Sequence, residues 1–189
     1  MSALLFPGQG SQMVGMCSEF HSNFEIVKKI FRQADEKLNQ PLSKLILDGP
    51  AEKLQLTQNT QPAILTVSYS IFKVLKEEFN FNFETFNYFA GHSLGEYSAL
   101  VCSESINFND ALYLLHERGK SMQEAVPVGK GNMIAILGVD IKELNEILNS
   151  LNKKEDGVCE IANDNAEGQV IASGDVESIN SLISILKEK

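Results

Sequence analysis

The residues most able to carry out chemistry lie in the stretch Gly91-His92-Ser93-Leu94-Gly95, which fits the pattern G-x-S-x-G. In this pattern a serine lies on a sharp turn between a strand and a helix. Side chains two residues before and two after the serine would collide, so glycine is required at both places. The turn also brings the serine to a helix N-terminus, whose free N–H groups can stabilise a developing oxyanion. An ordinary strand-to-helix turn is the alternative interpretation of these five residues.

A serine nucleophile needs a hydrogen-bonded base, usually histidine. His92 precedes Ser93 on a strand-like approach, where adjacent side chains diverge. His116 and Arg118 lie about 200° apart around one predicted helix, so His116 faces away if Arg118 faces the serine. His21 has no carboxylate at a suitable spacing. None of the three histidines is therefore expected to be the base.

Arg118 is a second candidate for chemistry. Its planar guanidinium can hold a free carboxylate through two parallel hydrogen bonds, a geometry that lysine cannot reproduce. The alternative is a surface arginine paired with Glu117 or Glu124.

The spacing of apolar residues predicts an α/β chain around these positions. Pro62 is expected in the first turn of a long helix, where its missing N–H costs nothing. The predicted elements of the first part are a strand at 3–6, a helix at 24–38 after a loop, a helical turn at 42–47, a helix at 61–79, a strand at 88–90, and helices at 94–102 and 108–126.

A change of composition at 126–131, with the sequence VPVGKG, predicts a boundary between domains 1–126 and 127–189. Beyond it the predicted elements are a strand at 133–137, a helix at 141–151, strands at 158–162 and 169–173, and a helix at 176–187. This β-α-β-β-α order is the ferredoxin-like order without its final strand. The chain is therefore expected to be the N-terminal part of a longer protein.

The composition excludes several classes of protein. The chain has 189 residues, of which 43% are hydrophobic, and a net charge of −9, which argues against binding nucleic acid. The start has no charged region before its short apolar run, and the longest apolar stretch is too short to cross a bilayer. Cys17, Cys102 and Cys159 form no zinc-binding pattern and suit a reducing compartment. We expect a cytoplasmic protein with no bound metal, no nucleic-acid partner and no membrane association.

Four motifs together resemble those of the malonyl-CoA:acyl carrier protein transacylases and of the related acyltransferase domains of fatty acid and polyketide synthases. They are FPGQGSQ at 6–12, GHSLGE at 91–96, RGKSMQ at 118–123 and NDNAEGQVIASG at 163–174. The resemblance implies a hydrolase-like large domain, with a parallel sheet and a nucleophile elbow, and a smaller ferredoxin-like domain that lacks its last strand. It also implies that Ser93 is the acylated nucleophile, that the backbone amides of Gln9 and Leu94 form the oxyanion hole, and that Arg118 binds the substrate carboxylate.

The activity implied by the resemblance is transfer of a malonyl group from coenzyme A to the phosphopantetheine thiol of acyl carrier protein in fatty acid biosynthesis. The group passes through a seryl ester, coenzyme A enters as part of the thioester substrate, and no other cofactor is expected. In this family the catalytic histidine follows the small domain, beyond residue 189. The alternatives are an acyltransferase domain of a larger synthase, a serine hydrolase, and a non-catalytic fragment that binds a carrier protein.

Overall fold

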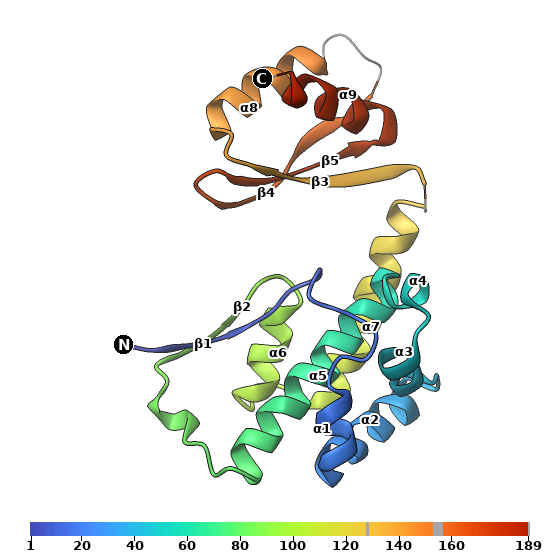
Figure 1. The fold of residues 1–189 in the computed structure, drawn as a ribbon, viewed down its shortest axis with the longest axis vertical. Coiled ribbons are helices and arrows are strands. Elements are labelled where there is room, and N and C mark those ends of the chain that lie inside the picture. Colours follow the sequence, from blue (N-terminus) through green and yellow to red (C-terminus); the bar gives the residue numbers. More distant parts are fainter. Residues whose placement is uncertain (128, 153–156, 189) are drawn as a thin grey trace. The chain divides into compact units, whose positions relative to one another are not determined.

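The computed structural model describes residues 1–127, 129–152 and 157–188 of an α/β chain (Figure 1). Its contacts divide into two compact units, Met1–Glu124 and Ala125–Lys189. The division lies close to the boundary predicted after residue 126, and Val128 of the predicted linker lies outside the described residues.

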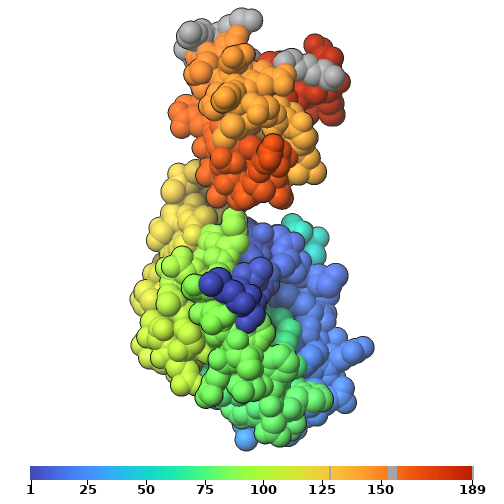
Figure 2. All heavy atoms as spheres, turned by 90° about the vertical axis from the view of Figure 1, so that its left-hand side faces the viewer, coloured from blue at the N-terminus to red at the C-terminus, as the bar shows by residue number. Residues whose placement is uncertain are grey.

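Two short parallel strands in the first unit determine where the serine lies. Strand β1 (Ala3–Phe6) pairs with β2 (Tyr88–Gly91), with Ala3 opposite Tyr88 and Phe6 opposite Gly91. The N-terminal residues lie on the surface of this unit (Figure 2), and Leu5 is 73% exposed. Because parallel strands end at the same edge, the loop after Phe6 and the turn after Gly91 emerge side by side.

Helices pack against this strand pair and supply most of the core of the first unit. Helix α6 packs against both strands, and α5 packs against α2 and α6. Phe31, Leu65 and Leu112, from three different helices, are fully buried in one apolar cluster. The elements are α1 (Ser18–Asn23), α2 (Glu25–Leu38), α3 (Leu42–Asp48), α4 (Ala51–Leu54), α5 (Thr57–Glu77), the short 3-10 helix η1 (Phe83–Thr85), α6 (Gly95–Cys102) and α7 (Phe108–Ala125).

The structure corrects the sequence analysis at three helices. Helix α1 occupies part of a segment predicted as a loop, and α4 was not predicted. Helix α5 begins at Thr57, four residues before the predicted start, so Pro62 lies inside the helix and not in its first turn. A proline inside a helix leaves one carbonyl without its usual donor.

The second unit is a three-stranded antiparallel sheet with two helices on one face (Figure 1). Buried residues such as Ile136, Leu144 and Ile179 form its core between sheet and helices. Met133 and Leu137, which alternate with Ile136 along one strand, are 56% and 71% exposed. The elements are β3 (Gly131–Leu137), α8 (Ile141–Leu151), β4 (Cys159–Ala166), β5 (Gln169–Asp175) and α9 (Val176–Lys187), with the strand order β3-β5-β4.

Strand β4 extends to Ala166, four residues past its predicted end, and joins β5 through a two-residue turn at Glu167 and Gly168. Across the ranges that the structure describes, no helix combines the length and the apolar content needed to cross a bilayer.

Candidate active site

Ser93 lies on a tight turn between β2, which ends at Gly91, and α6, which begins at Gly95. Its φ is +54°, in the left-handed region that residues with a side chain rarely adopt. A side chain at Gly91 would overlap the backbone of Gly95, as the pattern predicts. A side chain at Gly95 would instead meet the end of β1, since its Cβ would lie 2.5 Å from the carbonyl oxygen of Phe6. Both glycines are therefore required by close backbone contacts.

The loop after β1 lies against this turn. A Cβ at Gly8 would be 2.8 Å from the carbonyl oxygen of His92, so the two backbones are in close contact. The side chain of Gln9 donates a hydrogen bond from Nε2 to Oγ1 of Thr57 at 3.2 Å, which links the loop to the start of α5. In the described parts of the chain, the backbone amides of Gln9 and Leu94 donate no hydrogen bond. Gln9 is exposed, whereas Leu94 is fully buried.

Arg118 on α7 contacts the serine directly. Its Nη2 donates to Ser93 Oγ at 3.0 Å, and its Nη1 donates to Oε1 of Gln61 at 2.6 Å. Within the described ranges Arg118 forms no ion pair with Glu117 or Glu124. The structure thus brings Ser93 and Arg118, two of the residues predicted from sequence, into one hydrogen-bonded group.

Gln61 is a member of this group that the sequence analysis missed. It lies on α5, is fully buried, and donates from Nε2 to Sδ of Met122 at 3.4 Å while its oxygen accepts from Arg118. A buried amide must find partners for both its donor and its acceptor. The signal available in the sequence is a glutamine within TQPAIL, an otherwise apolar run of the helix.

The described residues pair no histidine ring with the Ser93 hydroxyl, whose hydrogen bond is with Arg118. Nδ1 of His116 lies 3.2 Å from the carbonyl oxygen of Gln58. The ring of His21 lies 5.0 Å from that of Phe31. The expectation that neither His116 nor His21 serves as the base stays a prediction.

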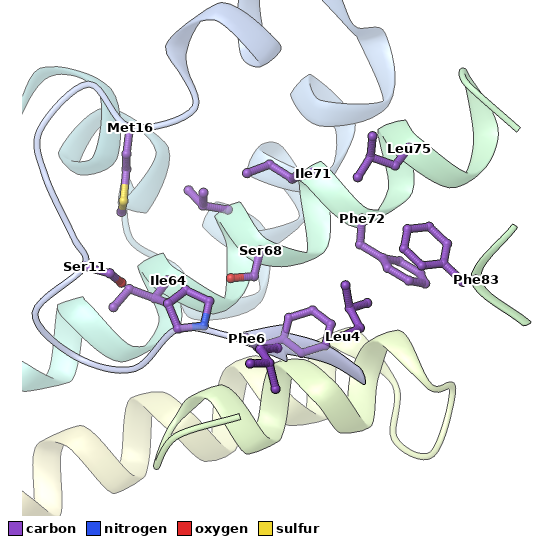
Figure 3. A pocket seen from close by; sticks show the side chains of 13 residues that line it. Leu4, Phe6, Ser11, Met16, Ile64, Ser68, Ile71, Phe72, Leu75 and Phe83 are labelled. Atoms are coloured by element: carbon purple, nitrogen blue, oxygen red, sulfur yellow. The ribbon is translucent and has the colours of Figure 1, made fainter. Parts of the chain in front are cut away.

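An apolar cavity of about 270 Å³ lies elsewhere in the first unit, lined mainly by β1 and α5 (Figure 3). Leu4, Phe6 and Phe72 are among its lining residues, and the described residues that line it carry no charge. It includes neither Ser93 nor Arg118, so a charged acyl group would find no partner there. The described ranges also hold no cluster of three His, Cys, Asp or Glu residues suited to a metal ion.

The fold and the site together define an α/β protein with a candidate serine nucleophile and an adjacent candidate carboxylate-binding arginine. A family model described as the acyl transferase domain matches residues 3–189, so the chain belongs to the acyl transferase family.

Several relatives and solved structures resemble the chain over nearly its whole length. It is 43% identical over 186 residues to the malonyl CoA-acyl carrier protein transacylase of Bacillus subtilis, a match that covers 98% of this chain and 57% of the relative. The acyl-carrier-protein-S-malonyltransferase of Bartonella henselae superposes with a TM-score of 0.90 at 38% identity, covering 100% of this chain and 60% of the other. A malonyl-transacylase solved in complex with a type II PKS acyl-carrier protein gives a TM-score of 0.85 at 39% identity, over 94% of this chain and 56% of the other. The chain thus spans somewhat more than half the length of these relatives.

Proposed function

We propose that the protein to which these residues belong transfers a malonyl group from coenzyme A to the thiol of an acyl carrier protein, through an ester on Ser93. Coenzyme A enters as part of the substrate and not as a resident cofactor. The proposal draws on the relatives, which are named as malonyl CoA-acyl carrier protein transacylases, and on the geometry around Ser93.

One observation carries the choice of substrate: the guanidinium of Arg118 lies 3.0 Å from Ser93 Oγ. In a malonyl thioester a single methylene separates the carboxylate from the reacting carbonyl carbon. A nucleophile and a carboxylate-binding group must therefore lie within a few ångströms of each other to hold both ends. A planar, permanently charged guanidinium already fixed by Gln61 suits this task.

In the first step Ser93 Oγ bonds to the thioester carbonyl carbon, the carbon–sulfur bond breaks, and the serine proton passes through a base to the departing thiolate. The backbone amides of Gln9 and Leu94 would hold the oxyanion. In the second step the carrier-protein thiol attacks the ester, reforms a carbon–sulfur bond and releases Ser93. A covalent intermediate means that the two thioester carriers need not bind at once.

The general base is proposed to lie outside residues 1–189. Ser93 is hydrogen-bonded to Arg118 within the described residues, and a guanidinium cannot accept a proton. The rate at which the 189-residue chain is acylated tests this part of the proposal.

The finer description of the fold belongs to the same proposal. The parallel pair β1 and β2, with the tight turn at Ser93, is consistent with one part of a hydrolase-like sheet. The strand order β3-β5-β4 is consistent with the first three strands of a ferredoxin-like domain. The free cysteines Cys17, Cys102 and Cys159 are consistent with a cytoplasmic location.

The decisive experiment measures intact mass after incubation with malonyl-CoA, on the 189-residue chain and on a version extended at its C-terminus. We expect a malonyl adduct on the extended protein and a much slower reaction of the short chain, because loss of a base costs a serine enzyme on the order of 10⁴-fold in rate.

The control is Ser93→Ala in the extended protein, which should carry no adduct. An adduct on that variant would exclude Ser93 as the nucleophile. Rapid acylation of the short chain would instead place a base within residues 1–189. Release of free malonate in the presence of acyl carrier protein, without transfer, would identify a hydrolase.

A further inference from the structure

Pro62 leaves an unusual carbonyl on α5, on the side that faces α7. In an α-helix the N–H of residue i donates to the carbonyl of residue i−4. Pro62 lies inside α5 and has no N–H, so the carbonyl of Gln58 cannot receive its usual helical bond. A carbonyl in this position needs a donor from another source.

His116 supplies that donor from the neighbouring helix. Its Nδ1 lies 3.2 Å from the Gln58 carbonyl oxygen, and His116 is only partly exposed. Because a carbonyl oxygen can only accept, Nδ1 must carry the proton. The bond exists in both the neutral and the cationic imidazole, since Nδ1 can be protonated in each.

The two helix backbones touch beside this bond. A Cβ at Gly119 would lie 2.6 Å from the Cα of Gln58, so no side chain fits between α7 and α5 at this point. Contact through a glycine leaves α7 without an interlocking side chain at this point, although Leu115, one turn earlier, is fully buried in the apolar cluster of the first unit.

His116 and Arg118 lie on either side of Gly119 when viewed along α7, about 200° apart. Each is bonded to α5: His116 to Gln58 and Arg118 to Gln61, three residues further along the same helix face. The two bonds therefore restrain α7 on both sides of the Gly119 contact, in addition to the packing of its buried residues Leu112 and Leu115. The orientation of this part of α7 affects where the Arg118 guanidinium lies.

We propose that His116 is a positioning residue: by donating to the carbonyl left free by Pro62, it holds the part of α7 around Gly119 against α5 and so helps to keep Arg118 on Gln61 and Ser93. The effect of this hydrogen bond on catalysis rests on the proposed function. Its effect on the position of Arg118 is independent of that function.

The first test needs no substrate and follows the guanidinium N–H signals of Arg118 by ¹⁵N NMR in the full-length protein. We expect His116→Ala to broaden or shift these signals toward those of a solvent-exposed arginine. His116→Asn should preserve them, because the asparagine amide nitrogen, like Nδ1, is bonded to Cγ and can donate to Gln58. Leu114→Ala, at a half-exposed neutral position on the same helix, is the matched control and should leave them unchanged. Unchanged signals in His116→Ala, or equal loss in His116→Asn, would overturn the proposal.

The second test is a double-mutant cycle with Pro62→Ala, which restores a backbone N–H facing the Gln58 carbonyl. In the natural background His116→Ala should raise the KM for malonyl-CoA by about three- to tenfold, the effect of losing one hydrogen bond. The rate of acylation by acetyl-CoA, whose acyl group has no carboxylate, should change less than the reaction with malonyl-CoA. In the Pro62→Ala background the same substitution should have a clearly smaller effect on KM. Equal effects in the two backgrounds would show that His116 does not serve this carbonyl.

The two proposals can fail separately. If the unaltered full-length protein is not acylated by malonyl-CoA, the proposed function fails, and the NMR comparison still decides the role of His116. If His116→Ala does not fold, His116→Asn and the Pro62→Ala pair keep the test open, because one keeps a donor and the other supplies a new one.

Discussion

At Arg118 the two terminal nitrogens have different partners. Nη1 bonds to Gln61, whose other end is occupied by Met122, while Nη2 bonds to the exposed Ser93. The buried bond holds the guanidinium plane in place. Under the proposed function, the bond to Ser93 would be exchanged for one to the substrate carboxylate while the bond to Gln61 is kept.

Replacing Arg118 by lysine tests this arrangement. A lysine ammonium keeps the charge but cannot bond Gln61 and a carboxylate through a planar fork. We expect acylation by malonyl-CoA to slow by about ten- to a hundredfold, the cost of a charge-assisted hydrogen bond. Acylation by acetyl-CoA should change by a much smaller factor. The ratio of the two rates, measured by intact mass, is the readout, and an equal loss for both substrates would contradict a carboxylate-binding role.

At the scale of single residues, the sequence was informative where a residue lies in a recognisable motif. Ser93 between its glycines and Arg118 in its motif could be singled out, and the structure brings them together. Gln61 could not be singled out from the sequence, because a glutamine in a helix is usually solvated. Its role depends on burial and on Met122 and Arg118, which lie far along the chain.

The turn between β2 and α6 is built by contacts between elements that are distant in sequence. Parallel pairing brings Phe6 beside Gly91, and the loop after β1 then packs on the turn at Gly95. Substitution of Gly91 or Gly95 would therefore disturb both strands.

Gly91→Ala is expected to destabilise the first unit by about 2 kcal/mol or more, because the new Cβ overlaps the backbone of Gly95 and a backbone cannot move aside cheaply. Urea unfolding followed by circular dichroism measures the change. The matched control is Gly157→Ala, whose close neighbour is the side-chain hydroxyl of Ser178, which can rotate away. Similar midpoints for Gly91→Ala and the unaltered protein would contradict the close contact.

Long amphipathic helices were predicted well, and short ones were not. The three- and four-residue apolar spacing locates α2, α8 and α9 within a residue of their observed bounds. Helices α1 and α4, of six and four residues, are too short to show a period. The start of α5 was misplaced because Pro62 was taken as a first-turn residue. Inside the helix, Pro62 leaves the Gln58 carbonyl to a contact with His116 of α7, which local sequence cannot reveal.

Across the whole molecule, the apolar core is divided between the two units. The cluster that contains Phe31 and Leu112 belongs to the first unit, and the cluster around Leu144 and Ile179 belongs to the second. Each unit has its own buried thiol, Cys102 in the first and Cys159 in the second. These thiols can report on the opening of each unit separately.

Alkylation of the thiols at pH 8 should therefore distinguish the stabilities of the two units. Burial raises the pKa of Cys102 to about 12 and that of Cys17 to about 11, so in the folded chain both stay protonated and unreactive at this pH. Leu148→Ala should destabilise the second unit by about 2–5 kcal/mol. We expect alkylation of Cys159 to accelerate by about thirtyfold or more. The rate at Cys102, measured by peptide mass mapping, should change little. Equal acceleration at both cysteines would mean that the units open as one.

The positive φ of Ser93 sets the stability of the turn against the need for a hydroxyl group at this residue. An L-amino acid in the left-handed region costs about 1–2 kcal/mol, a penalty that glycine avoids. The residue that would make this turn most stable is therefore one with no hydroxyl at all. If Ser93 is the nucleophile, the protein tolerates a less stable turn here so that the serine oxygen can project from it. A stabilising substitution of Ser93 by glycine would then remove the activity.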